Sequence, residues 1–281
     1  MHYSWQTTQW QQFEELLQHE RLPHALLISG SYGLGHQDFA HHVIASLLCN
    51  ERTDNSSDAC GHCHSCQLFM AKSHPDHTHI APEDTGKQIK IEQIRALKTK
   101  QTLTSHVAKW KTAIIDPAEN MTISAFNSLL KLLEEPEANT FLVLLSSNSV
   151  KLPMTIISRC QRLHLTQPSE EQALTWLKQR VDLQNDQLKH LLAATSGAPL
   201  ATLELIESGT ADKLVKTSRD FEQIMQGKGN PVTLAKKWHD IDLHIILNYF
   251  QLALKSQITE QIKRGDQHQI KHYWSIYDCI I

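Results

Sequence analysis

The chain has 281 residues, and its 27 lysines and arginines against 30 aspartates and glutamates give a formal net charge of −3. Apolar residues make up 41% and charged residues 20%, which is an ordinary globular composition. This balance excludes nucleic-acid binding by bulk positive charge but leaves a local basic patch possible. No apolar run approaches the ~20 residues of a membrane span, and the N-terminus lacks a signal-peptide pattern. We therefore expect a soluble, cytoplasmic protein.

Hydrophobic periodicity predicts an alternation of helices and buried strands up to residue 166, and helices alone after it. The expected strands cover residues 25–29, 111–116, 141–145 and 160–165. The expected helices cover residues 9–19, 37–48, 91–103, 122–135, 152–157, 169–180, 185–195 and 199–207, and the pattern stays helical beyond Gly209. The change of class near residue 166 predicts a domain boundary there.

The last residues, from Trp274 to Ile281, form an apolar pattern without a polar tail. We expect either that the full-length protein continues or that this end packs on a partner. The intact mass of the native gene product distinguishes the two. A glycine-rich turn at residues 227–231 marks a hinge or a loop.

A glycine-rich loop lies between the first predicted strand and the helix that follows it. Gly30 and Gly35 have the spacing of a phosphate-binding P-loop, but His36 stands at the lysine position and Gln37 at the Ser/Thr position. The lysine neutralises phosphate charge and the hydroxyl ligates Mg²⁺, and neither replacement does the same work. Backbone amides at the helix start can still hold an anion. The loop is therefore either a degenerate nucleotide site, without hydrolysis, or only a tight turn.

The strand at residues 111–116 ends in Asp116-Pro117, where active P-loop ATPases carry Asp-Glu. Asp116 could support Mg²⁺, but Pro117 has no side chain that could position the attacking water. The alternative role of Asp116 is to cap the next helix. Both motifs have lost a catalytic group, so we expect no ATP hydrolysis.

Four cysteines lie close together in the sequence. Cys60, Cys63 and Cys66 are spaced to share one ion, and Cys49 can supply a fourth thiolate. This donor set is typical of a closed, structural zinc site. An iron–sulfur cluster would need a cysteine where Met70 stands, and four free thiols are the other alternative.

Histidines near this cluster offer further, weaker possibilities. His62 and His64 could replace a cysteine ligand, although Cys49 removes the need. His77 and His79 lie two apart on an expected strand, so they share a face, and with His74 they could form a second metal site. Solvated or hydrogen-bonded imidazoles are the simpler interpretation.

Arg159 lies in Ser158-Arg159-Cys160, at the entry to the strand predicted from Cys160. It could form a surface ion pair. It could also serve as an arginine finger for a nucleotide in a neighbouring subunit, since a guanidinium is always charged and forks onto phosphate oxygens. Spacing alone does not choose between these roles.

Taken together, these motifs resemble the delta-prime family of bacterial DNA polymerase III clamp-loader subunits. The matching segments, in the family's order across residues 20–200, are Leu22–Ser29, Cys60–Leu68, Ser73–Asp76, Asn127–Pro136 and Leu152–Cys160. The resemblance implies an AAA+ domain over residues 1–166, of P-loop type with a parallel sheet and a zinc insertion at 49–66. A three-helix lid over 167–208 and an all-α collar domain over 209–281 would follow, the collar incomplete if the chain is truncated.

The resemblance also implies a role. A delta-prime subunit is a rigid, non-hydrolysing stator that contacts the delta subunit on one side and a gamma/tau ATPase on the other. Through the complex it acts with the sliding clamp and primer-template DNA, and Arg159 would reach the neighbour's ATP. The lid segment Ser196–Ala201 lacks the nucleotide-sensing arginine of the ATPases, which again argues against ATP binding.

Two other functions remain as alternatives. The first is an active ATPase motor subunit of the gamma/tau type, for which turnover by the pure chain would be required. The second is a zinc-containing DNA-binding protein outside replication, for which tight, salt-dependent binding would be required.

Overall fold

The computed structural model describes residues 2–52, 57–84, 86–225, 230–239, 241, 243–264 and 267–280. The chain divides into two compact units, Met1–Gln167 and Pro168–Ile281. The predicted glycine-rich turn at 227–231 lies mostly outside the described residues, and Ile281 lies outside them as well. None of the described helices combines the length and apolar character that a bilayer crossing requires.

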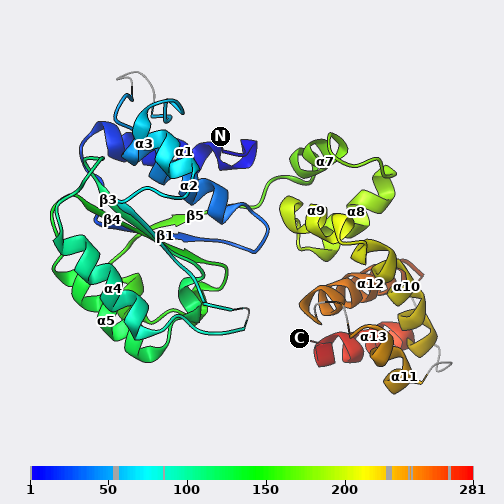
Figure 1. The fold of residues 1–281 in the computed structure, drawn as a ribbon. Coiled ribbons are helices and arrows are strands. Elements are labelled where there is room, and N and C mark those ends of the chain that lie inside the picture. Colours follow the sequence, from blue (N-terminus) through cyan, green and yellow to red (C-terminus); the bar gives the residue numbers. More distant parts are fainter. Residues whose placement is uncertain are drawn as a thin grey trace. The chain divides into compact units, whose positions relative to one another are not determined.

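The first unit is an α/β domain built on a parallel sheet (Figure 1). Its strands are β1 (Ala25–Ser29), β2 (His77–Ile80), β3 (Lys111–Ile115), β4 (Thr140–Ser146) and β5 (Gln161–His164). Its helices are η1 (Ser4–Gln6), α1 (Thr7–Gln18), α2 (His36–Leu48), α3 (His64–Met70), α4 (Ile91–Thr102), η2 (Ala118–Asn120), α5 (Ile123–Glu134), η3 (Ser149–Lys151) and α6 (Met154–Ile157).

The strands are hydrogen-bonded in the order β2-β3-β4-β1-β5, and every pairing is parallel. Leu26 of β1 pairs with Gln161 of β5, and Ser29 pairs with His164. The carboxyl ends of all strands therefore meet at one edge of the sheet and the amino ends at the other. The expected α/β domain with a parallel sheet is confirmed.

Helices cover both faces of this sheet, with α1, α2 and α3 on one face and α4 and α5 on the other (Figure 1). The three central strands β1, β3 and β4 are mainly apolar, and β4 is buried along its whole length, as a sheet covered on both sides requires. The edge strands β2 and β5 are more polar. Helix α5 has an apolar stripe that faces the sheet, and Thr122 caps its start by accepting the N–H of Ala125.

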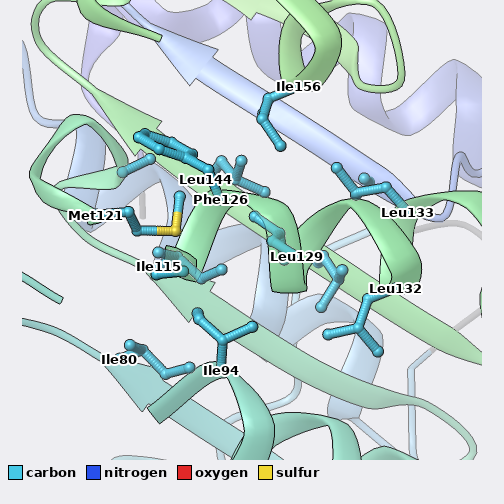
Figure 2. Packing of buried hydrophobic residues seen from close by; sticks show 14 of the residues in the cluster. Ile80, Ile94, Ile115, Met121, Phe126, Leu129, Leu132, Leu133, Leu144 and Ile156 are labelled. Carbon is cyan, nitrogen blue, oxygen red and sulfur yellow. The ribbon is translucent and has the colours of Figure 1, made fainter. Parts of the chain in front are cut away.

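A large apolar core joins α4 and α5 to the sheet. Figure 2 shows the side chains of this cluster, in which Ile115 of β3 and Leu144 of β4 belong with Leu129 and Leu133 of α5. Ile156 of α6 belongs to the same cluster and is fully buried. This packing holds α6 against α5 and the sheet. Arg159 lies two residues beyond the end of α6.

The second unit is all helical, as predicted. It contains α7 (Glu170–Lys178), α8 (Asn185–Ala194), α9 (Pro199–Glu207), α10 (Thr210–Met225), α11 (Pro231–Lys237), α12 (Leu243–Arg264) and α13 (Gln267–Ile280). Ser169 caps α7 in a capping box with Gln172. One core joins Leu191 of α8 and Leu205 of α9 to residues of α10 and α12. The predicted division of this unit into lid and collar stays a prediction.

Candidate functional site

The glycine loop connects β1 to α2 at the carboxyl edge of the sheet. Gly35 precedes α2 with φ of 86°, in the left-handed region that favours glycine. A Cβ on Gly35 would lie 2.7 Å from the Tyr3 ring, and a Cβ on Gly30 would lie 2.8 Å from the carbonyl oxygen of Leu165. Both glycines are therefore explained by close packing within this chain.

The N-terminal turn η1 is packed directly on this loop. The Trp5 indole N–H and the Gln6 side-chain amide donate to the carbonyl oxygen of Leu34, at 3.1 and 2.8 Å. The Gln6 amide also donates to Gly35 at 3.0 Å, and its oxygen accepts the Tyr3 N–H. Gln6 is completely buried. The turn thus fastens residues 34 and 35 in place, a contact that sequence analysis did not predict.

His36, at the P-loop lysine position, is turned into the protein. Burial lowers its pKa to about 4, so the imidazole is neutral at pH 7. Its Nε2 atom is buried and has no hydrogen-bond partner among the described residues. That atom lies 3.0 Å from the position of a Cβ on Gly30. The side chain therefore fills space under the loop and presents no positive charge to a phosphate.

Gln37 and Asp116, the two residues at the Mg²⁺-supporting positions, are hydrogen-bonded to each other. The Gln37 Nε2 atom donates to Oδ2 of Asp116 at 2.5 Å. Burial raises the pKa of Asp116, because the charged carboxylate loses solvation there. With Pro117 beside Asp116 and His36 buried, these residues do not fit a magnesium-bound triphosphate.

One acidic residue near this edge was missed by sequence analysis. Glu119, three residues after Asp116, accepts the backbone N–H groups of Ser147 and Asn148 through Oε1, at 3.0 and 3.1 Å. Ser147 also donates its hydroxyl to the same oxygen at 3.1 Å. Glu119 therefore ties η2 to the segment that follows β4. Only its nearness to Asp116 in the sequence could have drawn attention to it.

The four predicted cysteine ligands converge. The sulfur atoms of Cys49, Cys60, Cys63 and Cys66 all lie within 4.8 Å of one another. Four sulfurs at ~2.3 Å from a central ion in a tetrahedron lie about 3.8 Å apart, and Cys60 and Cys66 are separated by 4.0 Å. The donor set and its geometry fit a metal ion and are consistent with zinc.

Backbone N–H groups surround these sulfurs. Cys60 N–H donates to the sulfur of Cys49 at 3.3 Å, Cys63 N–H to that of Cys60 at 3.3 Å, and Cys66 N–H to that of Cys63 at 3.5 Å. Burial opposes ionisation of Cys63, but the N–H groups of Cys66 and Asn50 outweigh it and lower its pKa to about 6. Thiolate character before any ion binds is therefore favoured at Cys63, whereas burial raises the pKa of Cys49 and of Cys66.

The histidines near the cluster have other partners. His74 is buried and hydrogen-bonded to Ser65 Oγ at 2.8 Å, and His77 Nδ1 lies 2.9 Å from Thr112 Oγ1. Burial lowers the pKa of His77 to about 3. Within the described residues, the groups of three or more converging ligands are the four cysteines and the surface set Glu51, Cys60 and His62. His74, His77 and His79 do not converge there as a metal site.

Arg159 lies on the surface beyond the end of α6, with its side chain 37% exposed. Its Nη1 atom donates to the carbonyl oxygen of Thr155 at 2.9 Å, and Nη2 lies 2.8 Å from Oε1 of Glu134. The surface ion pair considered from the sequence is therefore present. The segment Ser196–Ala201 lies in the second unit, between the end of α8 and the first turn of α9.

The structure places Arg159 and the glycine loop at opposite edges of the sheet. Arg159 comes two residues before β5 begins, whereas Gly30 and Asp116 directly follow the carboxyl ends of β1 and β3. Leu26 lies beside Gln161, and Gly30 follows Leu26 by four residue steps along β1 and its carboxyl end. At ~3.3 Å per residue, these edges are about 13 Å apart.

Comparison with known proteins places this arrangement in a family. The family model described as "DNA polymerase III, delta subunit" matches residues 5–169. The DNA polymerase III subunit delta' of Pseudomonas aeruginosa is 32% identical over 249 residues, covering 88% of this chain and 74% of the relative. That of Haemophilus influenzae is 36% identical over 211 residues, covering 75% of this chain and 62% of the relative.

A solved structure described as a DNA polymerase III gamma subunit-related protein of Thermotoga maritima is 22% identical, with a TM-score of 0.46. It covers 95% of this chain, which in turn spans 77% of that structure. The match of the family model over more than half of the chain, together with the identity to these relatives, shows that the chain belongs to the DNA polymerase III delta' family.

Proposed function

We propose that the chain is the non-hydrolysing stator subunit of a bacterial DNA polymerase III clamp loader, a cytoplasmic assembly. In this proposal it contacts the delta subunit on one side and a gamma/tau ATPase on the other. Through the complex it takes part in loading the sliding clamp onto primer-template DNA. Residues 167–208 serve as its lid and residues 209–281 as its share of the collar. Membership of the delta' family supports this assignment.

The observation that carries the proposal is the separation of Arg159 from the chain's own glycine loop. Arg159 stands at the amino edge of the parallel sheet and the loop at the carboxyl edge. An arginine so placed cannot contact a phosphate on its own loop, but its exposed guanidinium can contact a nucleotide bound by an adjacent subunit. Arg159 is therefore proposed as an arginine finger that acts in trans.

The state of the loop supports the non-hydrolysing half of the proposal. The N-terminal turn is hydrogen-bonded to residues 34 and 35, and His36 is buried and neutral. The Gln37 side chain donates a hydrogen bond to the Asp116 carboxylate. A triphosphate would lack the cation, the Mg²⁺ support and the water-positioning carboxylate. The chain by itself is proposed to have no ATPase activity.

The four cysteines are proposed to hold a structural zinc ion. Four thiolates fill a tetrahedral coordination sphere and leave no position for a substrate, so the ion would only stabilise the fold. Cys49 follows α2 and Cys66 lies within α3, so the ion would fix the insertion to the domain core.

The test is the ATPase activity of a clamp loader reconstituted with the Arg159→Ala chain. We expect ATP hydrolysis at the site next to this subunit to fall about 10³-fold or more, with assembly intact. Arg162→Ala is the matched control, because Arg162 is an exposed arginine three residues further on, in β5. Equal hydrolysis by the two variant complexes would refute the finger role.

A further inference from the structure

Glu134 holds the guanidinium of Arg159 from the neighbouring helix. Nη2 of Arg159 lies 2.8 Å from Glu134 Oε1, while Nη1 donates to Thr155 at 2.9 Å and faces Ser158 Oγ at 3.5 Å. The guanidinium is therefore held both by α6, which ends two residues before Arg159, and by α5. A guanidinium carries five N–H groups, so these contacts leave donors available for a phosphate.

The two helices that carry this pair are rigidly packed. Glu134 is the last residue of α5, and its neighbour Leu133 lies in the same buried cluster as Ile156 of α6. Figure 2 shows Leu133 and Ile156 among the core side chains over the sheet. The core thus fixes the spacing between the carboxylate and the start of the arginine side chain.

Helix stability does not explain the position of Glu134. A carboxylate in the last turn of a helix faces the negative end of the macrodipole, which is unfavourable. The ion pair is also exposed, with side-chain exposures of 37% for Arg159 and 48% for Glu134. Exposed pairs of this kind contribute little to folding stability.

We propose that Glu134 is the positioning residue of the arginine finger: it fixes the direction in which the Arg159 guanidinium leaves α6. This inference rests on the proposed function. A free arginine side chain samples many rotamers, and a finger must reach a phosphate in one of them. Holding one edge of the guanidinium removes that search and leaves the remaining donors at a fixed place on the surface.

The test uses the full chain in the reconstituted clamp loader, with Glu134→Ala, Glu134→Gln and the matched control Glu135→Ala. Glu135 is the adjacent exposed glutamate. We expect Glu134→Ala to lower kcat at the neighbouring site by roughly 10- to 100-fold, because a misplaced group loses about that much. KM for ATP should change by less than about twofold, since the neighbour's own loop binds ATP. Glu135→Ala should behave as wild type.

Two further measurements separate positioning from a structural effect. Glu134→Gln keeps an oxygen that accepts from the guanidinium and should recover most of the lost rate. The double variant Glu134→Ala/Arg159→Ala should be no slower than Arg159→Ala alone, because both act on one group. The Tm of the Glu134→Ala chain should match that of Glu135→Ala.

The outcomes distinguish this inference from the proposed function. If Arg159→Ala abolishes hydrolysis at the site and Glu134→Ala does not slow it, Glu134 is not the positioning residue but the finger stands. A faster Glu134→Ala complex would also overturn the inference, by showing that the carboxylate restrains the arginine. If Arg159→Ala itself has no effect, the proposed function fails first.

Discussion

Replacing Gln6 by alanine tests whether the N-terminal turn closes the glycine loop. The Gln6 side chain is fully buried and makes three hydrogen bonds: to Leu34 at 2.8 Å, to Gly35 at 3.0 Å and from Tyr3 at 3.0 Å. At about 1 kcal/mol net for each bond, their loss costs about 3 kcal/mol. The cavity left by the truncated side chain adds to this cost.

The assay is urea unfolding of the first unit, followed by tryptophan fluorescence. Trp5, which lies in the turn, and Trp10, which lies in α1, are both buried and report on unfolding there. With an m-value of about 2 kcal/mol/M, a loss of 3 kcal/mol lowers the midpoint by about 1.5 M urea. Hydrogen exchange of the amides in residues 31–37 should rise in the same variant, because their anchor is lost.

Gln11→Ala is the matched control, since Gln11 is an exposed glutamine of the same helix region. Its unfolding free energy should stay within about 0.5 kcal/mol of wild type. If Gln6→Ala and Gln11→Ala unfold at the same urea concentration, the hydrogen bonds of Gln6 do not fasten the turn to the loop.

Three further predictions concern the metal cluster and two buried ionisable groups. Removing metal by chelation should lower the Tm of the chain and release one ion per molecule; release of no zinc would contradict the cysteine assignment. Asp76 accepts N–H groups from His106, Val107 and Ala108 at 2.7, 2.7 and 2.9 Å, so Asp76→Asn should cost about 2–4 kcal/mol in urea unfolding. Burial alone would raise the pKa of Asp76, but the three N–H groups lower it. The stability that the Asp76 carboxylate contributes is therefore present at neutral pH and is lost as the pH falls through that pKa. An unchanged urea midpoint in Asp76→Asn would contradict this role. The pKa of His36 is lowered to about 4, so stability falls as pH drops from the unfolded value of 6.5 towards 4. Between pH 7 and pH 5 the free energy of unfolding should fall by about 2 kcal/mol for this reason, and His36→Asn should abolish that fall. The same pH dependence in the variant would show that His36 is not its source.

The regular elements were predictable because their apolar periodicity is strong. The strand predicted at 111–116 corresponds to β3, and the helix predicted at 199–207 matches α9. Helix α3 was not predicted, since the cysteines and histidines around it hide any apolar period. Strand β2 was anticipated only through the spacing of His77 and His79.

The residues of the site were predictable, but most of their contacts were not. Motif spacing identified the four cysteines, Asp116 and Arg159. The bond between Gln37 and Asp116 and the contact of Gln6 with the loop join residues far apart in the sequence, and no local pattern encodes them. The Glu134 carboxylate beside Arg159 depends in the same way on how α5 and α6 pack.

ATP turnover by the purified chain alone, with Mg²⁺ present, decides whether this chain holds a working nucleotide site. With His36 buried, Gln37 bonded to Asp116 and Pro117 in place of an acidic residue, we expect no turnover above the uncatalysed rate. Measurable turnover that is lost in Asp116→Asn would contradict the account, because it would show a working nucleotide site in this chain.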